Sequence, residues 1–205
     1  MKKFELTNDT KIVFGKKLFR IKALVSFGNV KKDELGGYVE KEENLSHDGN
    51  AWVYGDAWVY GDARVCGDAR VYDDARVYGD AKVYGDAKVY GDAWVYGDAR
   101  VCGDAWVCGN ARVCGDAWVC GNARVYDDAD YTCVKGFGTV YRNTTFYFQK
   151  DGSIGVKCGC FSGTLEEFRE QVKNTREGKI AKEYLMIADL MEYHFEKEEG
   201  KGDNE

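Results

Sequence analysis

The residues of this 205-residue sequence that could do chemistry are eight cysteines, two histidines and a long row of aspartates. Cys158-Gly-Cys160 could supply two zinc ligands, and Cys133 and His194 could complete a Cys₃His site. The C-x-C spacing is less typical of zinc sites than C-x₂-C. Buried thiols in a strand explain the pair better, so we predict no metal and no other cofactor.

Neither histidine lies in a pattern that is typical of catalysis. His47 precedes the repeat described below, and His194 falls near the C-terminus. The signatures of Ser-His-Asp triads, Walker loops and dinucleotide-binding loops are absent from the sequence. We therefore predict no catalytic residue.

Aspartate recurs at a regular interval of six, and a column of carboxylates could bind Ca²⁺. Asparagine nevertheless stands at positions 50, 110 and 122 without disturbing the repeat. Both residue types tolerate the left-handed backbone region. We therefore interpret this position as a turn residue rather than a calcium ligand.

Five of the eight cysteines occupy one position of the repeat, where tyrosine stands elsewhere. Such an exchange indicates a packing position and argues against a disulfide framework. The first residues, M-K-K-F-E-L-T-N-D-T, lack the apolar stretch of a secretory signal. Reduced thiols and a cytoplasmic location, in a bacterium or in the host of a phage, are therefore expected. The five cysteines are Cys66, Cys102, Cys108, Cys114 and Cys120.

The positions of these residues are set by a hexapeptide repeat. It runs unbroken from Gly49 to Tyr126 as thirteen hexads of consensus G-D-A-x-V-Y. Alanine and valine are present in every hexad. They are separated by the single residue x, so an extended chain turns both to one side and turns x to the other. Gly-Asp then turns the chain.

The hexad array resembles left-handed parallel β-helices, in which three hexads make one triangular coil. The handedness and the three sides are implied by that resemblance. Many proteins of this fold are CoA-dependent acyltransferases that trimerise and use a histidine as general base. The whole chain resembles more closely the hexapeptide-repeat proteins of phages and gut bacteria, through L-G-G-Y-V-E-K-E-E-N-L-S, K-G-F-G, K-C-G-C-F and Y-L-M-I-A-D-L. This closer resemblance implies no particular activity.

The variable residue x forms three columns when every third hexad is grouped together. Cations and indoles are neighbours within the columns, at cation–π range, and the slot is expected to face solvent. The columns could bind a protein or stack nucleotide bases, or they could be a solvated surface whose Arg and Lys pair with Asp. The third column is Arg64, Lys82, Arg100 and Trp118, and the second ends at Asp130. The predicted binding residues come from the first column, Trp52, Arg70, Lys88, Trp106 and Arg124, and from the second, Trp58, Arg76, Trp94 and Arg112.

The segments that flank the repeat are predicted to cap it, because open coil ends would expose strand edges and core. Residues 1–48 are expected to form a β-rich cap and the start of the coil, with a turn at Gly15-Lys16. The β-helix is expected over 49–132. A cap over 133–198 should contain a hairpin around Asp151-Gly152 and two helices, the first opened by the T-L-E-E capping box at 164–167. Residues 199–205 are expected to be a disordered tail.

Charge and hydropathy restrict the function. Lys and Arg number 29 against 35 Asp and Glu, a net charge of −6, which argues against nonspecific binding to DNA, RNA or anionic membrane. No apolar run is long enough to span a bilayer. We predict a mainly β, non-enzymatic binding or scaffolding protein that forms a dimer or trimer. A phage origin would imply action on a host protein or a signalling nucleotide, and the alternative is a CoA-dependent acyltransferase.

Overall fold

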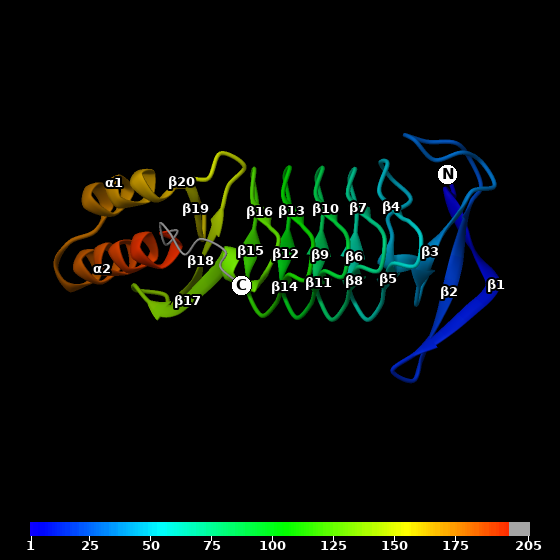
Figure 1. Ribbon diagram of the computed structural model, residues 1–205, viewed down its shortest axis with the longest axis horizontal. Coiled ribbons are helices and arrows are strands. Elements are labelled where there is room, and N and C mark those ends of the chain that lie inside the picture. Colours follow the sequence, from blue (N-terminus) through cyan, green and yellow to red (C-terminus); the bar gives the residue numbers. More distant parts are fainter. Residues whose placement is uncertain (197–205) are drawn as a thin grey trace, which may run out of the picture.

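The computed structural model describes residues 1–196 of the chain. The molecule is elongated, with an antiparallel N-terminal sheet, a stack of coils, and a C-terminal sheet with two helices following one another along its long axis (Figure 1). The coils form a β-solenoid of about 5 turns. The tail predicted over 199–205 lies outside the described residues.

Each hexad contributes one short strand, formed by x and valine, and these strands make three parallel ladders. Every coil strand before the last three pairs with the strand three hexads further on, as in Trp94 with Arg112 and Val95 with Val113. The prediction of a mainly β solenoid with three hexads per coil is therefore confirmed. Side one contains β4 (Trp52–Val53), β7 (Arg70–Val71), β10 (Lys88–Val89), β13 (Trp106–Val107) and β16 (Arg124–Val125); side two contains β5 (Trp58–Val59), β8 (Arg76–Val77), β11 (Trp94–Val95) and β14 (Arg112–Val113); side three contains β6 (Arg64–Val65), β9 (Lys82–Val83), β12 (Arg100–Val101) and β15 (Trp118–Val119).

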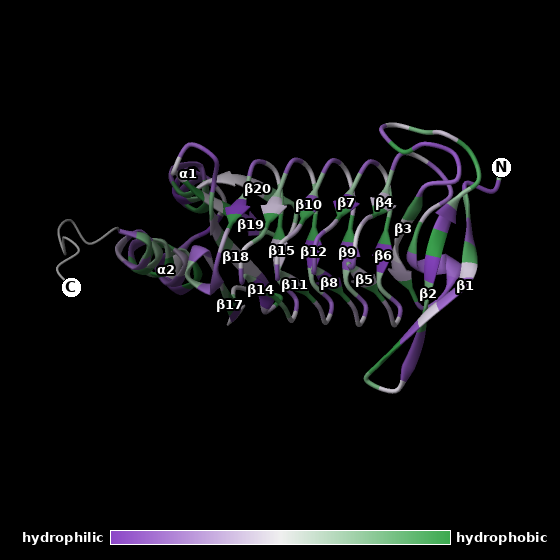
Figure 2. Ribbon diagram, turned by 45° about the vertical axis from the view of Figure 1, so that its right-hand side comes forward, coloured by the Kyte–Doolittle hydropathy of each residue, from purple (hydrophilic) through white to green (hydrophobic). Residues whose placement is uncertain are grey.

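The core of the solenoid is built from the alanine and valine columns. Every alanine from Ala51 to Ala123 and every valine from Val53 to Val125 in the hexads has an exposed fraction of 0%. Figure 2 shows the resulting alternation of hydrophobic and hydrophilic positions along each coil. Backbone hydrogen bonds join successive coils: the Trp94 N–H donates to the Ala111 carbonyl at 2.9 Å and the Tyr96 N–H to the Val113 carbonyl at 3.0 Å.

The corner of each hexad depends on glycine in the left-handed region. Gly85 has a φ of 72°, and a Cβ there would lie 2.9 Å from the amide nitrogen of Gly103 in the next coil. In the hexad that begins at position 73, Asp73 stands in place of the corner glycine and has a φ of 60°. Its carboxylate accepts a hydrogen bond from the Gly91 N–H at 3.2 Å. None of the regular Asp or Asn positions after the glycine has a positive φ among the described residues. These Asp and Asn residues lie in the turn as predicted. Their tolerance of the left-handed backbone region does not explain why they are there.

The N-terminal cap is a hairpin that extends the ladder of side two. β1 (Phe4–Val13) pairs with β2 (Lys16–Ala23), β2 pairs with β3 (Leu35–Val39), and β3 pairs in parallel with β5. The hairpin loop is Phe14-Gly15, with φ values of 50° and 77°, because Val13 pairs with Lys16. The predicted turn at Gly15-Lys16 was therefore wrong by one position. Both loop residues adopt the positive φ that a tight hairpin turn of this kind requires.

Lys3 covers the unpaired backbone edge of the first coil. It is 3% exposed and its Nζ donates to the carbonyl oxygens of Gly49 at 3.3 Å and Ala51 at 2.9 Å. Burial lowers the pKa of Lys3 to about 8. The amine therefore satisfies carbonyl groups that have no coil before them to pair with.

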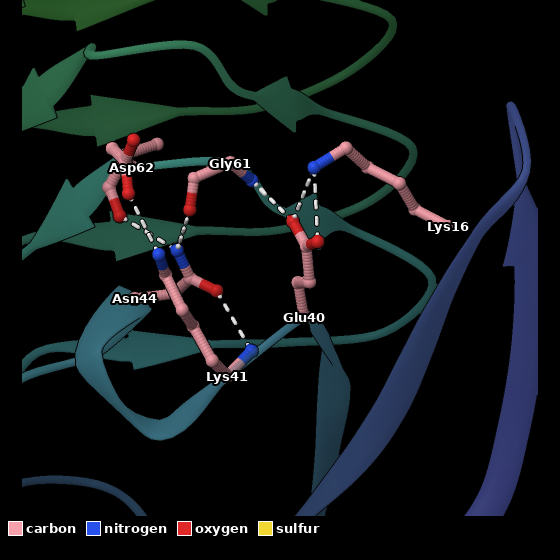
Figure 3. Close-up of polar contacts among 7 residues, drawn as sticks. Lys16, Glu40, Lys41, Asn44, Gly61 and Asp62 are labelled. Carbon is pink, nitrogen blue, oxygen red and sulfur yellow. Dashed lines mark hydrogen bonds and ion pairs between the residues drawn. The ribbon is translucent and has the colours of Figure 1, made fainter.

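The coil begins irregularly, before the first regular hexad. Val39 pairs with Val59, and Leu45 with Val65, so the partners are slightly further apart in the sequence than the strand pairs of the regular coils. The short helix η1 (Glu42–Asn44) lies in this longer first turn. Polar contacts fasten the turn to the next coil (Figure 3): the Glu40 carboxylate accepts from Lys16 Nζ at 2.9 Å and from the Gly61 N–H at 2.6 Å, and Asn44 Nδ2 donates to the Gly61 carbonyl at 3.0 Å.

The C-terminal cap begins after η2 (Asp128–Asp130) and is a four-stranded antiparallel sheet with two helices. The predicted hairpin, capping box and helices are present, whereas β17 and β20 were missed. One face of the sheet covers the last coil, where Thr145 Oγ1 accepts from the Trp118 N–H at 2.9 Å. The other face packs Phe146 and Val156 against the helices. The elements are β17 (Tyr131–Phe137), β18 (Arg142–Phe148), β19 (Ile154–Cys158), β20 (Phe161–Thr164), α1 (Leu165–Thr175) and α2 (Gly178–Phe195).

Deletion of positions 67–84 removes one whole coil and keeps every column in register. We expect this variant to melt cooperatively, only slightly below the wild type, when unfolding is followed by circular dichroism. Deletion of positions 67–75 is the matched control, because it removes one and a half hexads and leaves a coil that cannot pair with both neighbours. The control should lose its cooperative transition. Equal stability of the two variants would contradict a coil of three hexads.

Candidate functional site

The nine predicted binding residues lie on the ladders of sides one and two, in the columns expected from the resemblance to three-sided β-helices. Arg76 and Arg112 pair with Trp94 from the strands on either side of it. Lys88 pairs with Trp106 on side one. The parallel register therefore brings side chains from distant parts of the sequence into direct contact.

Two of the nine residues do not face solvent, which corrects the prediction for this slot. Trp52 has an exposed fraction of 0% and packs edge-on against Phe27, with ring centroids 5.4 Å apart. Arg124 is 8% exposed, and its Nη1 donates to the carbonyl oxygens of Asp104 at 2.9 Å and Ala123 at 2.8 Å. Both lie in end coils, where they are covered or drawn back onto the backbone.

Side two carries a continuous ladder of cation–π contacts. The Arg76 guanidinium lies 4.6 Å from the ring of Trp58 and 4.8 Å from that of Trp94. Arg112 lies 5.1 Å from Trp94, in the following coil. Lys11 of β1 extends the ladder at its N-terminal end, 4.8 Å from Trp58. Each cation is thus held over an aromatic face, where the attraction is worth roughly 0.5–1 kcal/mol at exposed sites.

The ladder of side two ends at Arg112, because Asp130 does not continue it. Asp130 belongs to η2, where its carboxylate accepts hydrogen bonds from the backbone N–H groups of Tyr126 at 2.6 Å and Asp127 at 3.1 Å. The expected fifth member of this column was therefore wrong. Asp127, which replaces the turn glycine, caps η2 by accepting from the Ala129 N–H.

Side one combines a shorter ladder with a groove. Trp106 lies 4.6 Å from Lys88 Nζ and 4.3 Å from the Arg124 guanidinium. An open groove of about 420 Å³ runs along this side, between the row of x residues and the aspartates at the adjacent corner. Arg70, Lys88 and Lys150 line it together with Asp68, Asp86 and Asp104. The groove is therefore polar and of mixed charge.

The coil cations do not pair with the coil aspartates. Within residues 1–196, seven of the eight cations in the x slot form no hydrogen bond or ion pair through their side chains, and Arg124 bonds only to backbone carbonyls. The coil aspartates that form ion pairs do so with residues of the caps, as in Lys41 with Asp62 at 2.7 Å. The interpretation of these columns as Arg–Asp and Lys–Asp pairs is therefore wrong. The nearest neighbours of each x residue are the x residues of adjacent coils, because the backbones of neighbouring strands are roughly 4.8 Å apart.

Residues of the caps add cations that the repeat could not reveal. Lys157 of β19 lies 4.2 Å from the ring of Trp118, and Lys11 contacts Trp58 from β1. Neither lysine belongs to the hexad pattern, and no spacing in the sequence connects either of them to its tryptophan. The sequence analysis missed the contacts of these two lysines with the coil tryptophans for that reason.

The Tyr/Cys position forms packed columns beside the x slot. Tyr60, Tyr78 and Tyr96 stack with ring centroids 4.9 and 5.0 Å apart and interplanar angles of 3° and 4°. Burial raises the pKa of the Cys66 and Cys108 thiols. A raised thiol pKa disfavours the reactive thiolate, which agrees with a packing role for this position.

On side three, Cys102 and Cys120 face each other from neighbouring coils. The interaction between the two thiols raises the pKa of Cys102 and lowers that of Cys120. Cys120 also contacts the Tyr147 hydroxyl at 3.3 Å, and Trp118 Nε1 donates to Cys102 Sγ at 3.1 Å. Both thiols are buried and are reduced in the structure.

The four residues considered for zinc do not assemble. Cys133 pairs with Thr145 and Cys158 with Thr144, and consecutive residues of β18 point to opposite faces of the sheet. Cys133 and Cys158 therefore lie on opposite faces. Within the described part of the chain, no three His, Cys, Asp or Glu side chains are placed to hold a metal ion.

The family comparison supports the repeat architecture. Residues 63–79, 69–85, 93–109 and 105–121 match the model of the YdcK beta solenoid repeat. The chain is a β-solenoid repeat protein. All four matches lie within the hexad array and leave both caps unmatched. A search of the curated proteins found no match. Among the described helices, none is long and apolar enough to cross a membrane.

A double-mutant cycle should detect the ladder of side two. We expect Trp94→Leu and Arg76→Met to show a coupling energy of about 0.5–1 kcal/mol in urea unfolding, because each change removes the same cation–π contact. Arg64→Met is the control partner for Trp94→Leu, since Arg64 lies on side three without an indole neighbour. That control cycle should give a coupling near zero. Additive effects in the first cycle would contradict the ladder.

Proposed function

We propose that this β-solenoid is a non-enzymatic binding or scaffolding protein that recognises a protein partner through sides one and two. The observation that supports this most is the state of the coil cations. None of them has a carboxylate partner among the described residues, and on sides one and two Arg76, Lys88, Arg112 and Arg124 lie against indole rings. Their N–H groups remain able to bond to carboxylate and carbonyl oxygens of a partner. Trp, Tyr and Arg are also the residues that most often anchor protein interfaces.

A protein partner suits these faces better than a nucleic acid or nucleotide. The repeat from Gly49 to Tyr126 holds 11 Asp against 8 Lys and Arg, and aspartates at the corners flank each row of cations. Such a surface repels a chain of phosphates but can complement the mixed charge of a protein surface. The resemblance to phage and gut-bacterial proteins implies that the partner is a bacterial protein.

The acyltransferase alternative would require a histidine with an available lone pair. His47 Nδ1 accepts a hydrogen bond from the Lys3 N–H at 3.1 Å, and Nε2 lies 3.5 Å from Glu42 Oε2. The ring stacks on Phe4 with centroids 4.4 Å apart. A neutral imidazole held in this way has its single lone pair in use and its proton directed at Glu42. His47 is thus suited to joining the N-terminal strand to the coil rather than to acting as a general base.

Self-association is part of the proposal, and α2 is the element that we infer mediates it. Met186, Leu190 and Tyr193 are 60%, 57% and 75% exposed and follow one another at helical spacing on one side of α2. Exposed apolar stripes of this kind mark contact sites. The charged residues Asp189 and Glu192 of α2 already pair with Arg169, so the apolar stripe carries this inference.

The partner interaction can be tested with charge-neutral variants of side two. We expect a bacterial protein, identified by cross-linking and then purified, to bind the wild type with an affinity that falls at least tenfold in the R76Q/R112Q double variant. Each lost charge-assisted contact is worth roughly 1.5–3 kcal/mol, which supports a change of this size. R64Q, on side three, is the control and should bind as the wild type does. Affinity that is unchanged in the double variant, or preferential retention of nucleotides, would contradict the proposal.

The α2 interface can be tested by light scattering. We expect the wild type to be a dimer and the M186D/L190D variant to scatter as a 23.1 kDa monomer, because two buried carboxylates oppose an apolar interface. I12D is the matched control, since Ile12 is also exposed but lies on the N-terminal hairpin. A wild-type monomer at micromolar concentration, or a dimer that survives in M186D/L190D, would overturn this part of the proposal.

A further inference from the structure

The C-terminal cap contains a cavity of about 190 Å³ between its sheet and its helices. Two segments that the sequence analysis singled out line it, K-C-G-C-F at 157–161 and the start of Y-L-M-I-A-D-L at 184, and a third, K-G-F-G at 135–138, contacts Tyr184. The Tyr184 hydroxyl donates to the Phe137 carbonyl at 3.3 Å. Gly138 has a φ of 73°, and a Cβ there would collide with the Tyr184 hydroxyl.

Two arginines from different elements line the mouth of this cavity. Arg142 begins β18 and Arg176 follows α1, and both are exposed. Arg176 Nη1 donates to the Thr175 carbonyl at 2.9 Å. Within residues 1–196 neither guanidinium contacts a carboxylate, whereas Arg169 of α1 pairs with both Asp189 and Glu192. Two unpaired guanidiniums in one cavity of an acidic protein form a site of positive potential.

The turn between Cys158 and Cys160 leaves room for one of these arginines. Gly159 has a φ of 59°, and a Cβ at this position would collide with the Arg142 guanidinium. The C-G-C sequence therefore lets the Arg142 side chain lie over the turn, directed at the cavity that Cys158 and Cys160 also line. This packing role accounts for the C-x-C spacing without a metal.

The floor of the cavity is apolar and buried. Phe168 and Val172 of α1 are each 3% exposed, and Phe161 of β20 packs against Phe168 with ring centroids 5.6 Å apart. Tyr184 adds a hydroxyl whose pKa is raised, chiefly by burial. An apolar cavity of about 150 Å³ is large enough for benzene. The space therefore matches a compact molecule with one apolar end and one anionic end.

We propose that this cavity binds a small organic anion, whose carboxylate or phosphate group lies between Arg142 and Arg176 and whose apolar body packs on Phe161, Phe168 and Val172. Guanidinium groups form paired hydrogen bonds with both kinds of oxyanion. This site is separate from the coil faces and does not depend on the proposed protein partner. It would make the C-terminal cap a ligand-binding module attached to the solenoid.

Titration calorimetry with benzoate and phenyl phosphate tests the site on the full chain. We expect at least one of these anions to bind saturably, and at least tenfold more tightly than benzyl alcohol, which lacks the charge, or inorganic phosphate, which lacks the ring. The tighter of the two identifies the class of oxyanion. R142Q and R176Q should each weaken binding of that anion at least tenfold. K173Q is the matched control, because Lys173 lies in the last turn of α1, near Arg176, and carries one positive charge but does not line the cavity.

Circular dichroism melts of each variant separate loss of the site from loss of the fold. Binding that is lost in a folded R142Q or R176Q variant, with chemical-shift changes confined to Tyr184, Cys158 and their neighbours, supports the proposal. Absence of saturable binding of both anions to the folded wild type would overturn it. Equal binding by R142Q, R176Q and K173Q, or chemical-shift changes at the coil tryptophans instead, would also overturn it.

Discussion

The backbone ladder between successive coils is the constraint on which the rest of this protein depends. Hexads donate backbone hydrogen bonds to the next coil, and the glycine at each corner lets the chain turn tightly enough for three hexads to close one coil. Adjacent coils are then roughly 4.8 Å apart. At that spacing every side chain has the equivalent residue of the next coil as its nearest neighbour. Alanine and valine therefore fill the interior as continuous columns, and one unsuited residue would affect the coils above and below it.

The same register determines the chemistry of the surface. Cations and indoles contact one another because they occupy the same slot of successive coils, whereas aspartates lie at the corners and form no ion pairs with them. The result is a surface in which Arg76 lies between two tryptophans and the tyrosines of the neighbouring column are stacked. Side chains held in this way have little conformational freedom left to lose.

The ladder also creates two ends that it cannot satisfy by itself, and the caps are the response. Lys3 and Asn44 donate to carbonyl groups at the first coils, and Thr145 accepts an N–H of the last complete coil. The caps differ in what they add. The N-terminal hairpin extends the aromatic–cation ladder of side two, while the C-terminal sheet separates the solenoid from two helices and creates a cavity of its own. The caps also bury residues of the end coils, such as Trp52.

The sequence by itself determined the solenoid, because a strict period makes the environment of one hexad the environment of all of them. The buried alanine and valine positions and the corner glycines follow from residue type and spacing, and the grouping of the x slot into three columns follows from the resemblance to three-sided β-helices. The tertiary structure decided the contacts that the repeat does not specify. It buried Trp52, placed Lys11 and Lys157 on the tryptophans of the coil, put Cys133 and Cys158 on opposite faces of a sheet, and brought Arg142 and Arg176 to one cavity. These contacts join segments without a shared repeat, and their partners depend on how each cap folds over the end of the coil, which no local spacing records.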